Sequence, residues 1–280
     1  MCCFPRWLPN QRIYVPCGQC LECMRHASTE WALRIMFEAK QYEKNCCVTL
    51  TYNDGNLPRN ALLEPRDLQL WVKRLRKAIS PATVRFFASG EYGEKRGRPH
   101  FHVILFGWQP DDMRYFFTRN GNDFFLSDFV QSTWAYQSIF GDFKYKNRTY
   151  APLGNILVGQ VDWSTAFYTA KYLQKSFKDV ARPPFVRMSN RPGIGYGAID
   201  FVNFDSYLEH PFVYFNGKRF SVPRYFWKKI EEFDPDFIDW QEWHAQRALA
   251  SRDSVLRTTT EQIEARRKKD YDFFHDLHPV

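Results

Sequence analysis

Hydrophobic and polar positions repeat with two different periods along this chain, which predicts strands in some stretches and helices in others. The period of two is clearest in residues 85–107, where apolar residues alternate on both sides of a short basic turn. This pattern predicts two strands that pair across the turn. Strands are expected at residues 46–52, 84–91, 100–107 and 155–161, and a hairpin is expected around the Asn-Gly pair within residues 206–234.

The helical period is clearest in residues 67–79, where five large apolar residues, beginning with Leu68 and Trp71, fall on one face. The other face is basic, and it is either a solvated surface or a contact for phosphate. Its one-sided charge favours the phosphate contact. Residues 108–135 are rich in aromatic residues but have no clear period. Helices are expected at residues 24–41, 67–79, 128–136, 165–177 and 241–271, and the basic face consists of Lys73, Arg74, Arg76 and Lys77.

Composition adds a class of partner to this picture. The 280 residues carry a net charge of +8, and 18% of them are aromatic. Nucleic acid suits this combination, because Lys and Arg neutralise phosphates while aromatic rings stack on bases. The sequence has neither an apolar run of 18 residues nor a secretory leader, so we expect no membrane span and a cytoplasmic location.

Five of the seven cysteines lie within the first 23 residues. Such clustering favours a metal or reduced thiols over a disulfide framework. Thiolates in a tetrahedral array favour zinc, while an iron–sulfur cluster and free thiols remain the alternatives. The expected ligand set is Cys3, Cys17, Cys20 and Cys23, with Cys2 as the alternative to Cys3.

Two histidines mark the second strand of the pair. His100 and His102 lie two residues apart, so their rings point to the same face of a strand. Glu91 ends the preceding strand and reaches that face if the two strands pair. Two imidazoles and a carboxylate form a site for a divalent metal with open positions. The alternative is that the histidines are half-buried packing residues.

The predicted helix at residues 165–177 carries a second group of reactive side chains. Tyr168 and Tyr172 are four residues apart, as are Lys171 and Lys175, so all four crowd one face. Apolar residues occupy a different side, which leaves the Tyr–Lys face free for a ligand. Phenols beside ammonium groups suit nucleophilic attack on phosphate, because lysine favours both the phenolate and the charged transition state. An amphipathic packing helix is the alternative.

Six stretches, in their order and spacing, resemble the replication initiator proteins of gokushovirus-type Microviridae, which are small circular single-stranded DNA phages. Such proteins are similar to members of the HUH endonuclease superfamily. The resemblance covers the chain up to about residue 200, and the stretches are VPCGQCLECM, CVTLTYND, DLQLWVKRLRK, GEYGEKRGRPHFHVILFG, YTAKYLQKS and SNRPGIG.

The resemblance implies an α+β fold with a central antiparallel sheet, flanking helices and an N-terminal Cys-rich segment. It implies that His100, His102 and Glu91 bind Mg²⁺ or Mn²⁺, with Glu91 in place of the third histidine of many HUH enzymes. Tyr168 and Tyr172 match the paired tyrosine nucleophiles. Lys171 and Lys175 match basic positions of the same motif, and Arg96 and Arg98 of the basic turn are added to the expected DNA contacts.

The implied activity is a DNA nicking and joining reaction in rolling-circle replication. One tyrosine forms a 5′-phosphotyrosine link, host polymerase and helicase act in the host cytoplasm, and the second tyrosine closes the strand. A non-catalytic zinc-stabilised nucleic-acid-binding protein and a phosphoesterase that activates water are the alternatives. The expected domains are a Cys-rich segment at residues 1–24, an endonuclease domain at residues 25–205 and a C-terminal extension at residues 206–280.

Overall fold

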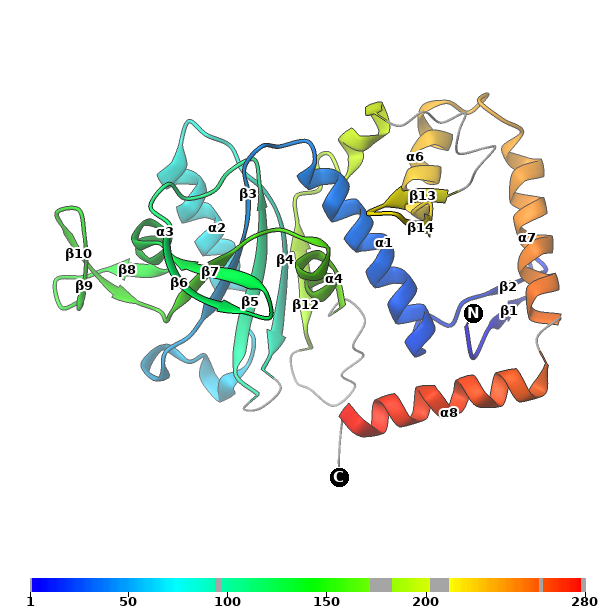
Figure 1. The fold of residues 1–280 in the computed structure, drawn as a ribbon, viewed down its shortest axis with the longest axis horizontal. Coiled ribbons are helices and arrows are strands. Elements are labelled where there is room, and N and C mark those ends of the chain that lie inside the picture. The colour runs from blue at the N-terminus through cyan, green and yellow to red at the C-terminus, as the bar shows by residue number, and fades with distance from the viewer. Residues whose placement is uncertain (1, 94–96, 172–182, 202–211, 257–258, 278–280) are drawn as a thin grey trace. The chain divides into compact units, whose positions relative to one another are not determined.

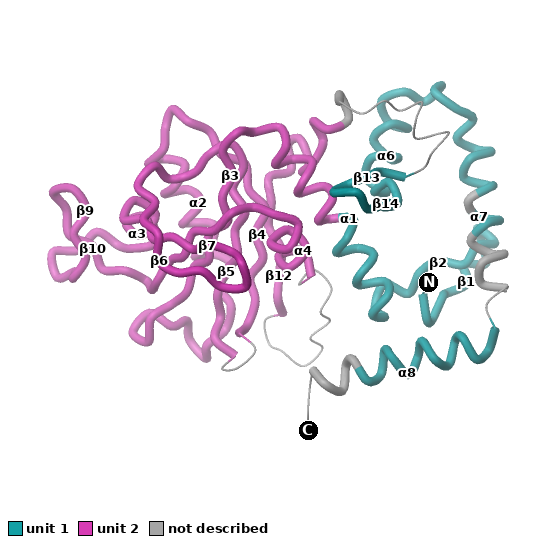
Figure 2. The backbone as a smooth tube through the Cα atoms, viewed as in Figure 1, with its two compact units in different colours: residues 1–30, 204–280 teal, residues 31–203 magenta. Residues whose placement is uncertain are grey.

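A computed structural model describes residues 2–93, 97–171, 183–201, 212–256 and 259–277 (Figure 1). The chain divides into two compact units (Figure 2). One unit is residues 31–203, and the other combines residues 1–30 with residues 204–280. The N-terminal cysteine segment therefore belongs to the same unit as the C-terminal part of the chain.

A seven-stranded sheet forms the centre of the unit at residues 31–203, with the strand order β12-β4-β5-β3-β11-β7-β6. All of its pairings are antiparallel, and helices flank it, which confirms the α+β class and the antiparallel sheet. The strands are β3 (Asn45–Thr51), β4 (Arg85–Tyr92), β5 (Pro99–Phe106), β6 (Arg114–Arg119), β7 (Asn122–Leu126), β11 (Ile156–Gly159) and β12 (Phe185–Met188).

Two hydrophobic clusters cover the two faces of this sheet. Helix α2 (Pro65–Ile79) packs on one face, where Trp71 and Leu75 lie in the same cluster as Val103 and Leu105 of β5. Helices α1 (Leu21–Ala39) and α4 (Trp163–Lys171) supply residues to the cluster on the other face. Burial on both faces explains why β5 continues as an unbroken apolar run after His102.

Three-residue to six-residue elements complete this unit, and the aromatic stretch accounts for several of them. The hairpin β6–β7 lies at the edge of the sheet, and most of β6 is exposed. Because neither face of β6 is buried, its sequence shows no alternation, and the prediction of no regular structure there was wrong. The remaining elements are α3 (Asp128–Thr133), the three-stranded sheet of β8 (Ala135–Gln137), β9 (Phe143–Tyr145) and β10 (Arg148–Pro152), and the 3₁₀ turns at Asp54–Asn56, Arg59–Ala61 and Tyr196–Phe201.

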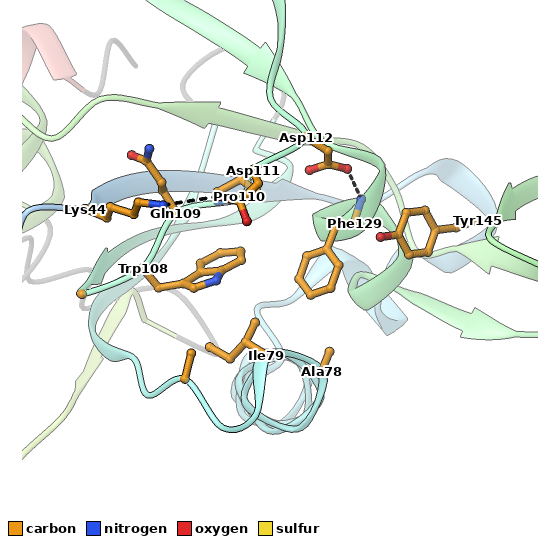
Figure 3. A pocket seen from close by; sticks show the side chains of 12 residues that line it. Lys44, Ala78, Ile79, Trp108, Gln109, Pro110, Asp111, Asp112, Phe129 and Tyr145 are labelled. Carbon is orange, nitrogen blue, oxygen red and sulfur yellow. Dashed lines mark hydrogen bonds and ion pairs between the residues drawn. The ribbon is translucent and has the colours of Figure 1, made fainter.

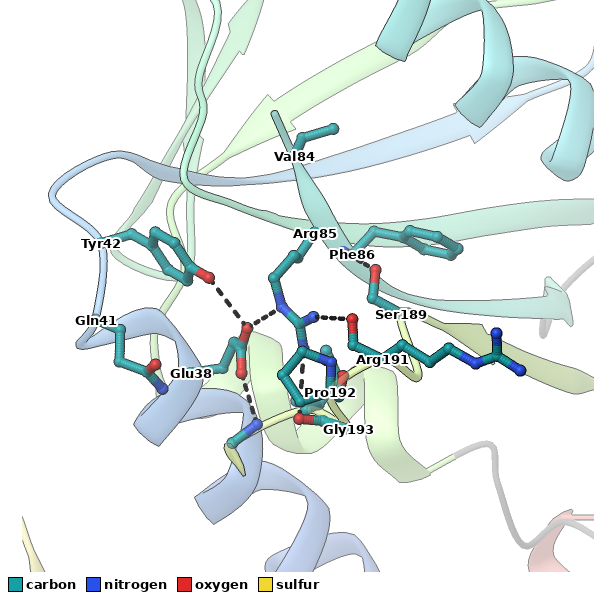
Figure 4. A network of polar contacts seen from close by, with 12 residues as sticks. Glu38, Gln41, Tyr42, Val84, Arg85, Phe86, Ser189, Arg191, Pro192 and Gly193 are labelled. Carbon is teal, nitrogen blue, oxygen red and sulfur yellow. Dashed lines mark hydrogen bonds and ion pairs between the residues drawn. The ribbon is translucent and has the colours of Figure 1, made fainter. Parts of the chain in front are cut away.

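A buried ion pair joins α1, β4 and the loop that follows β12 (Figure 4). Glu38 is buried, and its Oε1 lies 2.5 Å from Nε of Arg85. The second carboxylate oxygen accepts a hydrogen bond from the Gly195 N–H at 2.6 Å, and Arg85 donates to the Pro192 carbonyl at 2.8 Å. Gly195 has a φ of +79°, which suits glycine. The stretch SNRPGIG therefore acts in packing this loop.

The unit of residues 1–30 and 204–280 contains two small hairpins and three helices besides the start of α1. The predicted Asn-Gly hairpin is confirmed, and Asn216 and Gly217 have φ values of 48° and 72°, as its tight turn requires. Within the described ranges, none of the helices has the length and apolar composition of a transmembrane span. The elements are β1 (Arg6–Leu8), β2 (Ile13–Val15), β13 (Phe212–Phe215), β14 (Lys218–Ser221), α6 (Arg224–Phe233), α7 (Trp240–Leu256) and α8 (Thr260–Leu277).

Candidate active site

Strands β4 and β5 bring Glu91 and the two histidines to one point. Glu91 lies directly opposite His100 in the register of the two strands, and Ser89 lies opposite His102. Side chains two residues apart share a face of the sheet, so Glu91, His100 and His102 meet on the same side. That side is the one that α4 covers, because Ala166 and Ala170 of α4 are buried in the cluster on that face.

A single carboxylate oxygen is the centre of this group. Glu91 Oε1 lies 2.8 Å from Nε2 of His100 and 2.8 Å from Nε2 of His102. The Glu91 side chain is buried, with 1% of the residue exposed, while both histidines are half-buried. The three residues form one of the groups whose ligand atoms are close enough to share a metal ion.

Each histidine is held by its other ring nitrogen. His100 Nδ1 lies 3.1 Å from the Arg98 carbonyl oxygen, and His102 Nδ1 lies 3.0 Å from Thr49 Oγ1. A carbonyl oxygen only accepts, so His100 Nδ1 carries the proton of that hydrogen bond. When the ring is neutral, the lone pair is then on Nε2, as binding of a metal at Nε2 requires. Thr49 and the Arg98 carbonyl are not apparent from local sequence, but the pairing of β3 with β5 places Thr49 opposite His102.

The electrostatics keep this carboxylate charged. Burial would raise the pKa of Glu91, but its contacts with His100 and His102 outweigh burial and lower the pKa to about 2 from the ordinary 4.5. Burial would likewise lower the pKa of His100, and the hydrogen bond and charge of Glu91 outweigh that effect and raise it. The group therefore combines a permanent negative charge with imidazoles that exchange a proton near neutral pH.

Unsatisfied buried atoms test whether a cation fits here. In the described part of the chain, Ser89 Oγ, Glu91 Oε2 and His102 Nε2 are buried side-chain atoms that have no hydrogen-bond partner. His102 Nε2 contacts Glu91 Oε1 without the geometry of a hydrogen bond. Buried polar atoms are almost always satisfied, so three such atoms on paired strands indicate a missing ligand. Nitrogen and oxygen donors of this kind fit a divalent metal with open positions.

Helix α4 places Tyr168 beside the same oxygen. The Tyr168 hydroxyl donates to Glu91 Oε1 at 3.2 Å, and its ring meets the His102 ring edge-on with 5.3 Å between centroids. The predicted cap of this helix is present, since Asp162 accepts from the Thr165 N–H at 2.7 Å. Tyr168 is 40% exposed, so its phenol remains open to a substrate. Lys171 ends the described helix and is half-buried, and Tyr172 and Lys175 lie outside the described residues.

The basic residues expected to contact DNA divide into two groups. Arg74 donates to the Thr133 carbonyl at 2.8 Å and Arg76 to the Val84 carbonyl at 3.2 Å, so both guanidinium groups take part in packing. Arg98 pairs with Asp54 at 2.6 Å. Lys73 and Lys77 are exposed on α2, and Arg96 lies outside the described residues.

The pocket in Figure 3 does not include this site. It has a volume of about 520 Å³, and the side chains of Trp108, Phe129 and Tyr145 line it. Its charged groups serve the protein itself, since Lys44 pairs with Asp111 at 3.4 Å and Asp112 accepts from the Phe129 N–H at 2.8 Å. None of its lining residues belongs to the Glu91, His100 and His102 group.

A second group of metal-ligating side chains lies in the other unit. Cys2, Cys17, Cys20 and Cys23 have sulfur atoms within 4.8 Å of one another. The structure therefore brings Cys2 into this group where Cys3 was expected, and Cys3 instead lies with Cys20 and Asp270. Burial would raise the pKa of Cys17, but N–H groups of Gln19 and Cys20 and the nearby thiols lower it to about 7.

Comparisons with known proteins agree with this arrangement. Residues 45–177 match a family model that describes replication-associated proteins of the ORF2 type. The replication-associated protein ORF2 of Spiroplasma virus 4 is 31% identical over 280 residues, which cover 91% of this chain and 82% of that protein. The replication-associated protein VP4 of Bdellovibrio phage phiMH2K is 27% identical, with coverage of 89% and 77%.

The replication-associated protein ORF4 of Chlamydia phage 1 is 28% identical, with coverage of 80% of this chain and 56% of that protein. No solved structure matches the chain. The α+β fold with its antiparallel sheet and polar cluster is thus found in a chain whose relatives come from small phages. The chain belongs to the family of phage replication-associated proteins. The resemblance stated from the sequence is confirmed at this level.

Proposed function

We propose that this chain is a replication initiator that nicks and rejoins single-stranded or origin DNA of a small circular phage genome. The observation that carries the proposal is that one buried oxygen, Glu91 Oε1, contacts His100, His102 and the Tyr168 hydroxyl. A nucleophile and a set of metal ligands thus meet at one atom. The names of the relatives support a role in replication, and the tyrosine chemistry is our proposal.

His100, His102 and Glu91 would hold the metal, and a bound Mg²⁺ or Mn²⁺ supplies Lewis-acid polarisation of the scissile phosphate. The chain's own contribution is order. The Arg98 carbonyl and Thr49 fix the two rings, and Glu91 stays ionised because its pKa is about 2. The strands hold these groups rigidly before substrate arrives, so little reorganisation is needed.

Tyr168 is the proposed nucleophile. Its oxygen forms a bond to the phosphorus, the bond from phosphorus to the 3′ oxygen breaks, and a 5′-phosphotyrosine results. The phenol gives up one proton and the departing 3′ oxygen takes one up, so the step needs no co-reactant. Lys171, one turn further along α4, favours the phenolate and the charge that builds on the phosphate. Host polymerase then extends the free 3′-hydroxyl, while a host helicase unwinds the duplex.

Tyr172 and Lys175 complete the proposal as the second nucleophile and its basic neighbour. Residues 168 and 172 are one helical turn apart in sequence, which suits a relay between two tyrosines. In that relay Tyr172 attacks the regenerated origin, and the first strand is closed and released. Both residues fall within the range of the family model.

The test uses fragments that tile the phage's own single strand, incubated with the full chain and either Mn²⁺ or EDTA. Products are resolved on a denaturing protein gel. We expect a Mn²⁺-dependent shift of the wild-type band, loss of the shift in the Tyr168→Phe/Tyr172→Phe double variant, and an unaltered shift in Tyr214→Phe. Tyr214 is an exposed tyrosine in the other unit and serves as the matched control.

Three outcomes oppose the proposal. Cleavage without a shift that persists in the double variant indicates a phosphoesterase that activates water. Binding to every fragment without cleavage of any indicates a non-catalytic DNA-binding protein. Single variants at Tyr168 and Tyr172 that both nick and rejoin at the wild-type rate rule out the relay.

A further inference from the structure

The four N-terminal sulfur atoms form a compact group that the proposed nicking reaction does not use. Cys17 and Cys23 have their sulfurs 3.9 Å apart, and Cys2 and Cys20 have theirs 3.9 Å apart. All four sulfurs lie within 4.8 Å of one another, and the cysteines are not joined as disulfides. The family model begins at residue 45, so it says nothing about these cysteines.

The separations suit a single tetrahedral ion. A zinc–sulfur bond is about 2.3 Å, and the edge of a tetrahedron is about 1.63 times the distance from its centre to a corner, which gives roughly 3.8 Å between sulfurs. The two distances of 3.9 Å are close to this value. A [4Fe–4S] cluster binds each cysteine to a different iron and spreads the sulfurs further apart than this.

Backbone groups are arranged to stabilise negative sulfur. N–H groups of Phe4 and Cys17 donate to Cys2 Sγ at 3.4 and 3.1 Å. N–H groups of Gln19 and Cys20 donate to Cys17 Sγ at 3.4 and 3.3 Å. Cys20 directly precedes α1, and Cys23 lies in its first turn, where the helix dipole favours anions. Donors of this kind compensate the charge of four thiolates around one dication.

The position of the cysteines in the chain indicates what the ion would do. Cys2 precedes β1 and Cys17 follows β2, so they bracket a hairpin whose strands have three residues each. A two-stranded hairpin of this size is not stable by itself in water. Coordination of both ends of the hairpin by the same ion that binds the start of α1 supplies the missing stabilisation.

We propose that Cys2, Cys17, Cys20 and Cys23 bind one structural zinc ion that fastens the β1–β2 hairpin to the first turn of α1. Cys3 and Asp270 lie outside the four ligands. Asp270 of α8 accepts a hydrogen bond from the Leu21 N–H, and this contact places α8 beside the zinc ligand Cys20. The zinc site therefore also supports the contact of α8 with the beginning of α1.

The first experiment counts zinc in the full chain. Protein purified from zinc-supplemented cells, without chelator, is analysed by elemental mass spectrometry as wild type, Cys2→Ser and Cys3→Ser. To remove the other candidate site from the count, each protein also carries Glu91→Gln and His102→Ala. We expect about one zinc per chain in the wild-type cysteine background and in Cys3→Ser, and at least a tenfold weaker zinc affinity in Cys2→Ser.

The Cys3→Ser variant is a matched control, because Cys3 is buried next to Cys2 and contacts Cys20 but is not among the four ligands. Loss of zinc in Cys3→Ser with retention in Cys2→Ser would overturn the assignment in favour of Cys3, Cys20 and Asp270. Two zinc ions per chain, no zinc, or iron with visible absorption would each overturn it as well. The Glu91→Gln and His102→Ala background makes these results independent of the nicking proposal.

A second measurement remains valid if Cys2→Ser fails to fold. The wild-type chain with Glu91→Gln and His102→Ala is stripped of metal and titrated with Co²⁺. We expect the intense sulfur-to-metal charge-transfer bands and the visible absorption of a tetrahedral thiolate site, reached at one Co²⁺ per chain and removed by one equivalent of Zn²⁺. A spectrum of octahedral Co²⁺ without charge-transfer bands rejects the four-cysteine site.

Discussion

Glu91 is the residue on which the candidate active site depends, because its buried Oε1 is the atom that two imidazoles and a phenol share. Its position at the end of β4 follows from the pairing with β5, which sets it opposite His100. Thr49 is the corresponding support for His102, since its hydroxyl lies 3.0 Å from Nδ1 of that ring. Residues that orient a metal ligand in this way commonly affect metal affinity as strongly as some ligands do.

Substitution of Thr49 by Val should weaken metal binding without removing a ligand. The methyl group fills the same space, but His102 loses the partner that fixes its ring. We expect about a 10- to 100-fold loss of Mn²⁺ affinity, measured by electron paramagnetic resonance of free Mn²⁺. Thr118→Val, on the exposed strand β6, is the control and should bind Mn²⁺ normally. Equal affinities in the two variants would mean that His102 is not a ligand.

The pH dependence of stability should differ between the metal-free and metal-bound protein. Glu91 has a lowered pKa, so its contribution is present above about 4.5 and is lost as the pH falls towards 2. His100 has a raised pKa, so its contribution is full below 6.5 and is lost as the pH rises through the folded-state value. In EDTA, this group therefore stabilises the fold most between about pH 4.5 and 6.5.

A metal competes with the proton on His100, so the shift of the melting temperature that Mn²⁺ causes should grow from pH 5.5 to pH 8. Differential scanning fluorimetry with Mn²⁺ and with EDTA measures this shift across the range. The Glu91→Gln variant should show almost no shift at any pH. A shift that stays constant from pH 5.5 to 8 would contradict histidine ligation.

At the scale of elements, the site depends on two contacts of the central sheet with its surroundings. Helix α4 presents Tyr168 to the site because Ala166 and Ala170, on its other side, are buried against the sheet. Their small side chains let the helix approach closely. On the far end of β4, Arg85 and Glu38 join the strand to α1 and to the loop at residues 189–195.

Substitution of Glu38 by Gln should destabilise the unit of residues 31–203. The change leaves the half-buried Arg85 guanidinium without its charged partner. We expect the free energy of unfolding to fall by about 3–5 kcal/mol, measured by urea denaturation with tryptophan fluorescence. Glu43→Gln changes an exposed residue near the same helix and should stay within about 0.5 kcal/mol of wild type. A loss below about 1 kcal/mol in Glu38→Gln would mean that this pair contributes little.

At the scale of the whole molecule, a net charge of +8 favours contact with a nucleic acid. The structure distinguishes basic residues that can contribute to such contact from those already engaged. Arg74 and Arg76 donate to backbone carbonyls, while Lys73 and Lys77 are exposed on the same helix. The charged face predicted from the sequence is therefore half structural and half exposed.

The salt dependence of single-strand binding tests this distinction. For a single strand, the slope of log K against log salt is about −0.7 for each phosphate neutralised. The Lys73→Gln/Lys77→Gln variant should therefore lose up to about 1.4 from the slope, measured by fluorescence anisotropy between 50 and 300 mM salt. The control is Lys228→Gln/Lys229→Gln, because these lysines pair with Glu232. An unchanged slope in the α2 variant would exclude that face from the DNA contact.

Local pattern alone determined much of this protein. Alternation in β4 and β5, the helical period of α2 and the Asn216-Gly217 turn are local properties, because each depends on residues within a few positions of one another. The motif around His100 and His102 was readable for the same reason. The hairpin β6–β7 was not readable, because an exposed edge lacks the one-sided burial that imposes a period.

Only the tertiary structure decided which distant groups meet. Thr49 and Glu91 reach the histidines through strand register, and Cys2 rather than Cys3 joins Cys17, Cys20 and Cys23 because the β1–β2 hairpin turns the chain back. Adjacent residues such as Cys2 and Cys3 are equivalent in sequence spacing and differ only in the direction of their side chains. That direction is set by pairing and packing over long sequence separations, which no local pattern contains.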